Sequence, residues 1–453
     1  MGRYFLLLFI VPFSYAVQAQ VTKEYYENTS MLKAEGTLQN GVKEGVWKLY
    51  YPSGKSQGEE TYANNTLNGN VLYLHPNGQP SLTGTFSNGK EQGIWKEFYN
   101  NGKPSVQAVF KDGLRNGLYK EFYANGQISI DGSFKSDLKD STWKEYYPNA
   151  QSKIEGRYIL GNKEGDWKEY YENGKLYHQA FYKNGKIEGK VFWNFPEGTK
   201  ELTGQYTAGK MEGEWIDFYK DGKPQSVSHY KDSLEHGLFE EYAESGAKLF
   251  KGFYKNGLAD STWQYFYNNA SSTKKSVEIW NIGKLMSAPE YYDQTGVKLN
   301  AGALANGNGM RYFYYPKGAK MMDINYQQGL ESGIAVSYYE NGVKKTEVSF
   351  VMGLQDGMMN EYYPSGMMAS QTNYVHGSEN GLHKEYGKEG WLSVYGFYKN
   401  GSEDSIWFEF HANGKIFSEG YFANGLKEGE WFEYYDTDTL ASRGNYEHGK
   451  PVG

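Results

Sequence analysis

A 24-residue period runs through almost the whole chain, and it constrains the fold more than any other feature. Stepping by 24 from Gly45 to Gly429 gives 17 positions, of which 16 hold Gly or Ser and one holds Leu285. Two residues later in each step, one position holds eight of the 11 tryptophans. At Tyr50 and its equivalents, 14 of 17 residues are aromatic. Such a register, held over roughly 400 residues, predicts a repeat architecture.

Each period carries two turn signals and two short aromatic runs. Asn-Gly, which favours the positive φ angles of tight hairpin turns, recurs in two sets, for example at Asn173-Gly174 and at Asn184-Gly185. Helix is disfavoured because no 3.6-residue apolar stripe survives this density of Gly and rings. The sequence therefore predicts an all-β, elongated antiparallel β-hairpin repeat array of about 17 repeats, one hairpin to each period.

Alternation along a strand assigns the side chains to faces. Trp143, Glu145 and Tyr147 are expected on one face, and Lys144 and Tyr146 on the other. Both faces then carry rings, and stacked hairpins bring the rings of neighbouring strands together. The Gly before each Trp is interpreted as leaving room for a ring or a neighbouring backbone.

The period weakens between about residues 270 and 308. Glu278, Leu285 and Glu290, with Gln294 and Gly302, stand where other repeats hold a ring or Gly. The segment is interpreted as a bend, a boundary or a divergent repeat, and the retained phase at Gly309 favours a continuous sheet. The expected division is a signal peptide over 1–19, an N-terminal array over 20–269, degenerate repeats over 270–308 and a C-terminal array over 309–453. No separate C-terminal domain is expected.

The N-terminus is typical of a secretory signal peptide. Arg3 precedes an apolar stretch, and Val17-Gln18-Ala19 places small residues at a cleavage site before Gln20. The alternative is a short uncleaved anchor. We expect an exported protein, periplasmic or extracellular, that can associate with the envelope and has no integral membrane segment after cleavage.

Composition excludes several functional classes. With no Cys there is no disulfide, thiolate metal site or Cys nucleophile. A net charge of −7 with mixed signs gives no attraction to nucleic acid. The eight His form no metal-binding motif, and the repeated Lys-Glu neighbours, as in Lys144-Glu145, fit a solvated strand better than paired catalytic acids. We expect no catalytic residue, cofactor or metal, and no enzymatic activity.

The repeat resembles the MORN-repeat variant common in bacterial proteins and often labelled a YwqK-type antitoxin. The resemblance rests on units such as 167–175 (WKEYYENGK) followed by 182–189 (YKNGKIEG), and it covers nearly the whole mature chain. It implies hairpin repeats in an elongated sheet and binding to other macromolecules.

Two functional classes remain open. The first is a non-enzymatic scaffold that binds an unknown protein partner at the cell envelope. The second is a carbohydrate or cell-wall binder whose exposed rings stack on sugars, and the resemblance adds an antitoxin or immunity-like role. The candidate residues, which form either a binding surface or the core, are Trp47, Trp95, Trp143, Trp167, Trp215, Trp263, Trp407, Trp431, Tyr50, Tyr146, Tyr170 and Tyr434.

Overall fold

A computed structural model describes residues 19–452, which form strands and turns with no helix. The predicted signal peptide lies outside the described residues except for Ala19. Contacts within the chain divide it into two compact units, one ending at Lys210 and one beginning at Met211. Between residues 19 and 452, no helix is available that could cross a membrane.

The first unit contains the following strands: β1 (Ala19–Tyr25), β2 (Leu32–Gln39), β3 (Val42–Tyr50), β4 (Ser56–Ala63), β5 (Thr66–Leu74), β6 (Pro80–Ser87), β7 (Lys90–Phe98), β8 (Pro104–Lys111), β9 (Leu114–Phe122), β10 (Ile128–Lys135), β11 (Leu138–Lys139), β12 (Ser141–Tyr146), β13 (Ser152–Ile159), β14 (Asn162–Tyr170), β15 (Leu176–Lys183), β16 (Lys186–Asn194) and β17 (Lys200–Thr207).

The second unit contains the remaining strands: β18 (Lys210–Phe218), β19 (Pro224–Lys231), β20 (Leu234–Glu235), β21 (Gly237–Tyr242), β22 (Lys248–Lys255), β23 (Leu258–Phe266), β24 (Lys274–Asn281), β25 (Lys284–Tyr292), β26 (Lys298–Leu299), β27 (Gly309–Tyr314), β28 (Lys320–Gln327), β29 (Leu330–Glu331), β30 (Gly333–Tyr338), β31 (Lys344–Val351), β32 (Leu354–Tyr362), β33 (Met368–Val375), β34 (Ser378–Tyr386), β35 (Leu392–Lys399), β36 (Ser402–Phe410), β37 (Ile416–Ala423), β38 (Leu426–Tyr434), β39 (Leu440–Glu447) and β40 (Lys450–Pro451).

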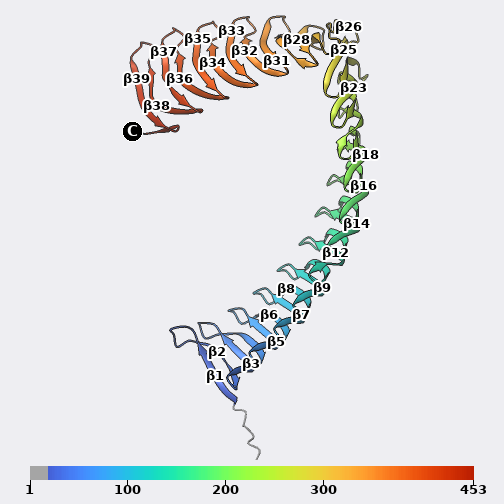
Figure 1. The fold of residues 1–453 in the computed structure, drawn as a ribbon, viewed down its shortest axis with the longest axis vertical. Helices are drawn as coiled ribbons and strands as arrows, with labels where there is room; N and C mark the ends of the chain where they lie inside the picture. Colours follow the sequence, from blue (N-terminus) through green and yellow to red (C-terminus); the bar gives the residue numbers. More distant parts are fainter. Residues whose placement is uncertain (1–18, 453) are drawn as a thin grey trace, which may run out of the picture. The chain divides into compact units, whose positions relative to one another are not determined.

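Strands pair antiparallel with their neighbours in the chain, as the ribbon shows for successive hairpins (Figure 1). In the first unit this pattern extends from β1 to β17. In the second unit β18–β26 pair in order, and β27–β40 form a separate sheet of 14 strands. The predicted all-β array of antiparallel hairpins is confirmed, and it is open because the chain neighbours account for the pairing.

Two kinds of turn alternate along the chain. At the Asn40-Gly41 turn both residues have positive φ, 54° and 79°, as a two-residue type I′ hairpin requires. At the other turn only the Gly has positive φ, for example Gly102 at 80°. There Asn101 accepts a hydrogen bond from the backbone N–H of Lys103 at 3.0 Å. The predicted Asn-Gly turns are present, but the Asn plays a different part in each set.

The Gly or Ser two residues before each Trp lies at a bulge. Around Gly45, the pairing steps from Glu35↔Lys48 to Thr37↔Glu44, and Gly45 has φ +70°. A side chain added at Gly45 would meet no atom within 4 Å. The interpretation that this Gly makes room for a ring is therefore wrong; the position requires a left-handed backbone, which Gly tolerates best.

The expected continuous sheet through residues 270–308 is also wrong. Pairing breaks between β26 and β27, where only isolated bridges join Gly302 to Arg311 and Ala305 to Asn308. The turn after β23 is two residues longer than usual, because the N–H of Tyr267 bonds to Thr273 whereas Tyr51 bonds to Lys55. The added residues move the pattern out of phase until Gly309.

The shift explains why the segment looks degenerate. When the pattern is shifted by two positions, the expected ring or small residue is found again. The residues concerned are Trp280, Ser287, Tyr292 and Gly296. Pro289 then occupies the tryptophan position in β25. Because Pro has no N–H for a ladder bond, it favours the end of strand pairing at this edge.

Candidate binding surface of the ring ladder

The tryptophan row is part of the core. Trp47 has no exposed surface, and exposure reaches only 8% at Trp407. Trp95 differs, since it is half-buried. The other buried members are Trp143, Trp167, Trp215, Trp263 and Trp431.

Seven of the eight tryptophans lie over a Gly that precedes them by 11 residues. A Cβ added to Gly156 would stand 2.3 Å from Cδ2 of Trp167, well inside van der Waals contact. The indole therefore packs directly on the backbone of the preceding strand. The same close approach is present at Gly36, Gly84, Gly132, Gly252, Gly396 and Gly420.

Repeats without Trp fill this space with other complementary pairs. Ala108 is paired with Tyr119, and Ala180 with Val191. Thr372 is paired with His383, whose Nδ1 lies 2.9 Å from the Thr hydroxyl. All eight tryptophans of the row have Gly 11 residues earlier. This covariation within the chain was missed by the sequence reasoning, although the printed sequence contains it.

Rings from the neighbouring strands pack edge-on against the indoles. Trp167 lies between Tyr158 at 4.9 Å and Tyr182 at 6.0 Å, measured between ring centroids, with planes 78° and 70° apart. Edge-to-face pairs add about 0.5–1.5 kcal/mol beyond the area they bury. Around Trp143, Gly132 lies beneath the indole, and the Phe134 ring lies 5.7 Å from it, edge-on.

A lysine covers the outer side of four of the tryptophans. Lys43 Nζ lies 3.9 Å from the ring centroid of Trp47, and Lys139 lies equally close to Trp143. Lys163 over Trp167 and Lys427 over Trp431 repeat the contact at 4.2 and 3.9 Å. Burial lowers the pKa of Lys163. At Trp95 and Trp407 the same sequence position holds Glu91 and Glu403.

The candidate tyrosines Tyr50, Tyr146, Tyr170 and Tyr434 are all half-buried. Tyr50 donates to Glu35 at 2.6 Å, Tyr170 to Glu155 at 3.3 Å and Tyr434 to Glu419 at 2.9 Å. The hydrogen bond to Glu35 raises the pKa of Tyr50.

A second tyrosine row links each repeat to the next. Tyr123 donates to the carbonyl of Tyr146 at 2.7 Å, and Tyr147 to that of Tyr170 at 2.8 Å. Donor and acceptor are 23 residues apart in the sequence. The same bond is made by Tyr99, Tyr171, Tyr219, Tyr315, Tyr339 and Tyr363. Sequence reasoning missed these bonds, although the tyrosine that follows the Tyr50 position could have indicated them.

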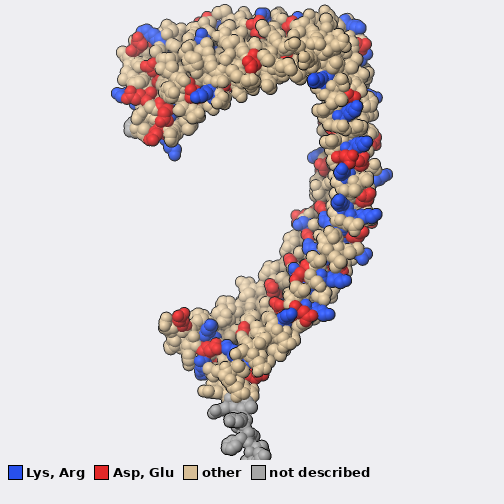
Figure 2. Space-filling view, viewed as in Figure 1, with Lys and Arg blue, Asp and Glu red and all other residues tan. Residues whose placement is uncertain are grey.

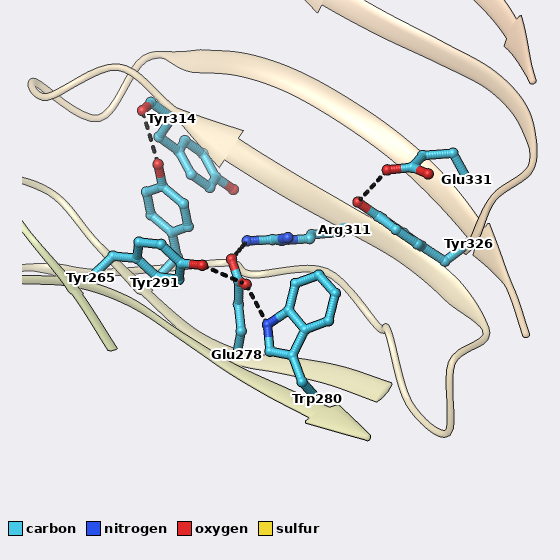
Figure 3. Close-up of polar contacts among 8 residues, drawn as sticks. All are labelled: Tyr265, Glu278, Trp280, Tyr291, Arg311, Tyr314, Tyr326 and Glu331. Atoms are coloured by element: carbon cyan, nitrogen blue, oxygen red, sulfur yellow. Dashed lines mark hydrogen bonds and ion pairs between the residues drawn. The ribbon is translucent and has the colours of Figure 1, made fainter. Parts of the chain in front are cut away.

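A buried ion pair replaces the usual ring packing near the sheet break (Figure 3). Arg311 of β27, at a tryptophan position, pairs with Glu278 of β24, and both side chains are less than one-tenth exposed. Glu278 also accepts hydrogen bonds from Trp280 at 2.8 Å and Tyr265 at 3.1 Å. Burial among these groups raises the pKa of Tyr265. A carboxylate held by three donors compensates the buried guanidinium.

Apolar residues that directly precede the tryptophan position form what we call the outer row. It contains Val46, Ile94 and Leu118 in the first unit and Ile334 and Ile406 in the second. Their exposure ranges from 44% at Ile406 to 60% at Ile334. Because side chains alternate along a strand, the outer row faces away from the indoles. Charged residues of both signs are interspersed over the visible face of the molecule (Figure 2).

The histidines and carboxylates are the remaining side chains that could act as ligands of a metal ion. Among residues 19–452, no three His, Asp or Glu side chains are placed to hold a metal ion. His229 and His236 make separate contacts, with the carbonyl of Leu238 and the side chain of Asn256.

The model of the MORN repeat variant matches the chain nine times, at residues 43–64, 91–112, 115–136, 163–184, 211–232, 331–352, 355–376, 403–424 and 427–448. The chain belongs to this family of repeats. The matches do not extend to the YwqK-type label. No curated protein matches the chain.

Solved structures of toxin complexes align with most of this chain at low similarity. The crystal structure of TcdB2-TccC3 has 9% identity and a TM-score of 0.13, covering 92% of this chain and 30% of that one. The Photorhabdus luminescens Tc holotoxin pore with mutation TccC3-D651A has 10% identity and a TM-score of 0.15, covering 95% and 30%. The chain thus spans less than a third of the length of these proteins, and scores this low carry no conclusion.

Proposed function

We propose that this chain is an exported, non-catalytic scaffold that binds a protein partner at the cell envelope through its outer row. The main support is the exposure of large apolar side chains at one repeated position of an ordered sheet. Exposed apolar groups that recur in a row are typical of interaction surfaces in repeat proteins. Ile94 and Leu118 stand one repeat apart, which is two strands or about 10 Å, and form the densest part of the row.

Side-chain type favours protein over glycan as the ligand. Sugars stack on flat rings, whereas the outer row consists of Val, Ile and Leu at its exposed members. Seven of the eight tryptophans in the row are buried, and a lysine covers four of them. A glycan array is retained as an arm of the test, and saturable, ring-dependent sugar binding would overturn this choice.

The experiment is cross-linking and co-purification of the full chain from its source cells. Ile94→Asp and Leu118→Asp should each abolish recovery of a partner protein, because an uncompensated charge is buried in the interface. Leu138→Asp, at an apolar residue of similar exposure outside the outer row, is the matched control and should retain the partner. Equal recovery with all three variants, or recovery of the chain alone, would contradict the proposal.

Export has its own test. N-terminal sequencing of the protein from the envelope fraction should give Gln20 as the first residue. A chain that starts at Met1 and remains in the cytosol would contradict the envelope location.

A further inference from the structure

A pocket lies beside Trp95, the half-buried member of the tryptophan row. The pocket has a volume of about 300 Å³ and lies over β6–β9. Two of its lining residues depart from the regular repeat: Glu91 stands at the position of the covering lysine, and Tyr119 at the next tryptophan position. The lining residues used below are Leu82, Glu91, Trp95, Glu97, Val106 and Phe110.

Other repeats show what fits against such rings. The ammonium of Lys139 lies 3.9 Å from the Trp143 centroid and 5.2 Å from that of Tyr158. At Trp95, the ring of Phe110 lies 5.9 Å away in the position that Tyr158 has beside Trp143. The aromatic pair is therefore present without the chain's own cation. Cations are attracted to indole faces within about 6 Å of the ring centroid.

Two carboxylates border these rings without a partner. Within residues 19–452, the side chains of Glu91 and Glu97 form no hydrogen bond or ion pair. Equivalents of Glu97 do find donors, since Glu145 accepts from Trp143 at 3.1 Å and Glu169 lies 3.7 Å from His178. A cation between Glu91 and Glu97 would be attracted by both carboxylates and by the face of the Trp95 ring.

The indole nitrogen of Trp95 is a second, independent sign of an unfilled site. Its N–H is buried and bonds to no atom in the described part of the chain. In five other repeats the indole donates to the backbone, as Trp167 does to Arg157 at 3.2 Å and Trp407 to Phe397 at 3.1 Å. Buried donors are rarely left without an acceptor, and a carbonyl on a bound peptide would supply one.

The one cation that lines the pocket is already neutralised. Arg115 bonds to Asp137 at 2.8 Å, and its guanidinium lies 4.0 Å from the ring centroid of Phe134, towards the next repeat. Leu82 and Val106 add apolar walls, which suit a hydrocarbon chain that ends in a charge.

We propose that this pocket binds a lysine side chain of the partner protein, with its ammonium over Trp95 between Glu91 and Glu97 and its methylenes against Leu82 and Val106. The proposal rests on the scaffold function above and specifies one contact of the partner. In other repeats a lysine of this chain covers the tryptophan. Beside Trp95, a lysine of the partner takes that place.

The test is a titration of the full chain, labelled at the tryptophan indole nitrogens, with the acetylated and amidated peptide Gly-Gly-Lys-Gly-Gly. The Trp95 resonance, assigned with Trp95→Phe, should shift in a saturable way. The same peptide with norleucine in place of lysine should not move it. Absence of a saturable shift, or an equal shift with norleucine, would overturn the proposal.

Glu91→Lys restores the lysine found at the other repeats and should fill the pocket. We expect affinity for the peptide to fall by at least about tenfold while the protein stays folded, since Lys139 already occupies the equivalent place over Trp143. Glu403→Lys, the same charge change beside Trp407, is the matched control and should leave binding at Trp95 unchanged. Equal affinity in all three proteins would overturn the proposal.

A further titration with n-butylammonium separates a partner's lysine from a free amine. Weaker binding than the peptide supports a protein ligand, and equal or tighter binding would replace it with a small alkylammonium solute. These titrations need no native partner. If the titrations fail, the pocket proposal is wrong and the scaffold function is unaffected. If co-purification fails, the scaffold function is wrong and the titrations still test the pocket.

Discussion

The tryptophan position is filled differently in the regular repeat at β13–β14 and in the junction at β24–β27, by an apolar ring in one and by a charged group in the other. In the first, Trp167 packs on Gly156 between two tyrosine rings. In the second, Arg311 takes the tryptophan position and pairs with Glu278. The strands pair in the first, whereas the sheet ends between β26 and β27 in the second. The comparison teaches that this position demands a filled space, and that a buried charge can fill it when a counter-charge compensates it.

The first prediction breaks the ion pair at the junction. Glu278→Ala leaves Arg311 buried without its counter-charge and should destabilise the surrounding strands by about 3–5 kcal/mol. Native-state hydrogen exchange over β24–β28 measures the change, and Glu409→Ala, at an exposed residue of β36, is the control, read out over β36. A loss no larger than that of Glu409→Ala would contradict a stabilising pair.

The second prediction removes a ring from the regular repeat. Trp167→Ala opens a cavity over Gly156 and should lower local stability in β13–β15 by about 3–5 kcal/mol. The cost should fall on these strands and their neighbours, because each hairpin contacts only the next ones. Loss of protection that extended equally over β1–β5 would argue against nearest-neighbour stabilisation.

The third prediction concerns alkaline pH. Burial raises the pKa of Tyr374 and of Tyr398 to about 12. Because the unfolded phenol ionises near pH 10, the contribution of these groups is complete below pH 10 and is lost as pH rises towards 12. Phenolate absorbance and circular dichroism should therefore change together in this window. Full ionisation with β-structure retained would contradict it.

The smallest effect is expected from the tyrosine row between repeats. Tyr147→Phe removes one hydrogen bond to the carbonyl of Tyr170 and should cost about 1 kcal/mol. Exchange of the amides in the turn over residues 147–151 reports the change. Tyr146→Phe is the control, because its hydroxyl lies on the other tyrosine row, and a larger loss there would reverse the assignment.

Much of this fold could be predicted from periodicity. The alternation around Trp143 and Glu145 and the Asn-Gly turns determine hairpins and faces through local rules. The wrong role for Gly45 shows the limit, since a left-handed bulge and a close ring contact both favour Gly. Only the three-dimensional pairing shows that Gly36, and not Gly45, lies beneath Trp47.

The junction could not be predicted for a different reason. Two residues are inserted in the turn after β23, so Trp280 and Tyr292 fall two positions away from where a fixed step of 24 expects a ring. A fixed step does not detect such an insertion. Contacts such as Glu278 with Arg311 join residues 33 positions apart, a separation that no local pattern encodes. The pocket beside Trp95 likewise depends on residues from four strands.

The central claim is that a ring and the residue 11 positions before it form one packing unit. A double-mutant cycle with Gly156→Ala and Trp167→Tyr tests it, because the double variant copies the Ala108–Tyr119 pair found elsewhere in the chain. Gly156→Ala alone should cost about 1–3 kcal/mol by overpacking, and the added Trp167→Tyr should recover part of that loss, with a coupling of about 0.5–3 kcal/mol. Strictly additive losses in the exchange of β13–β15 would contradict the claim.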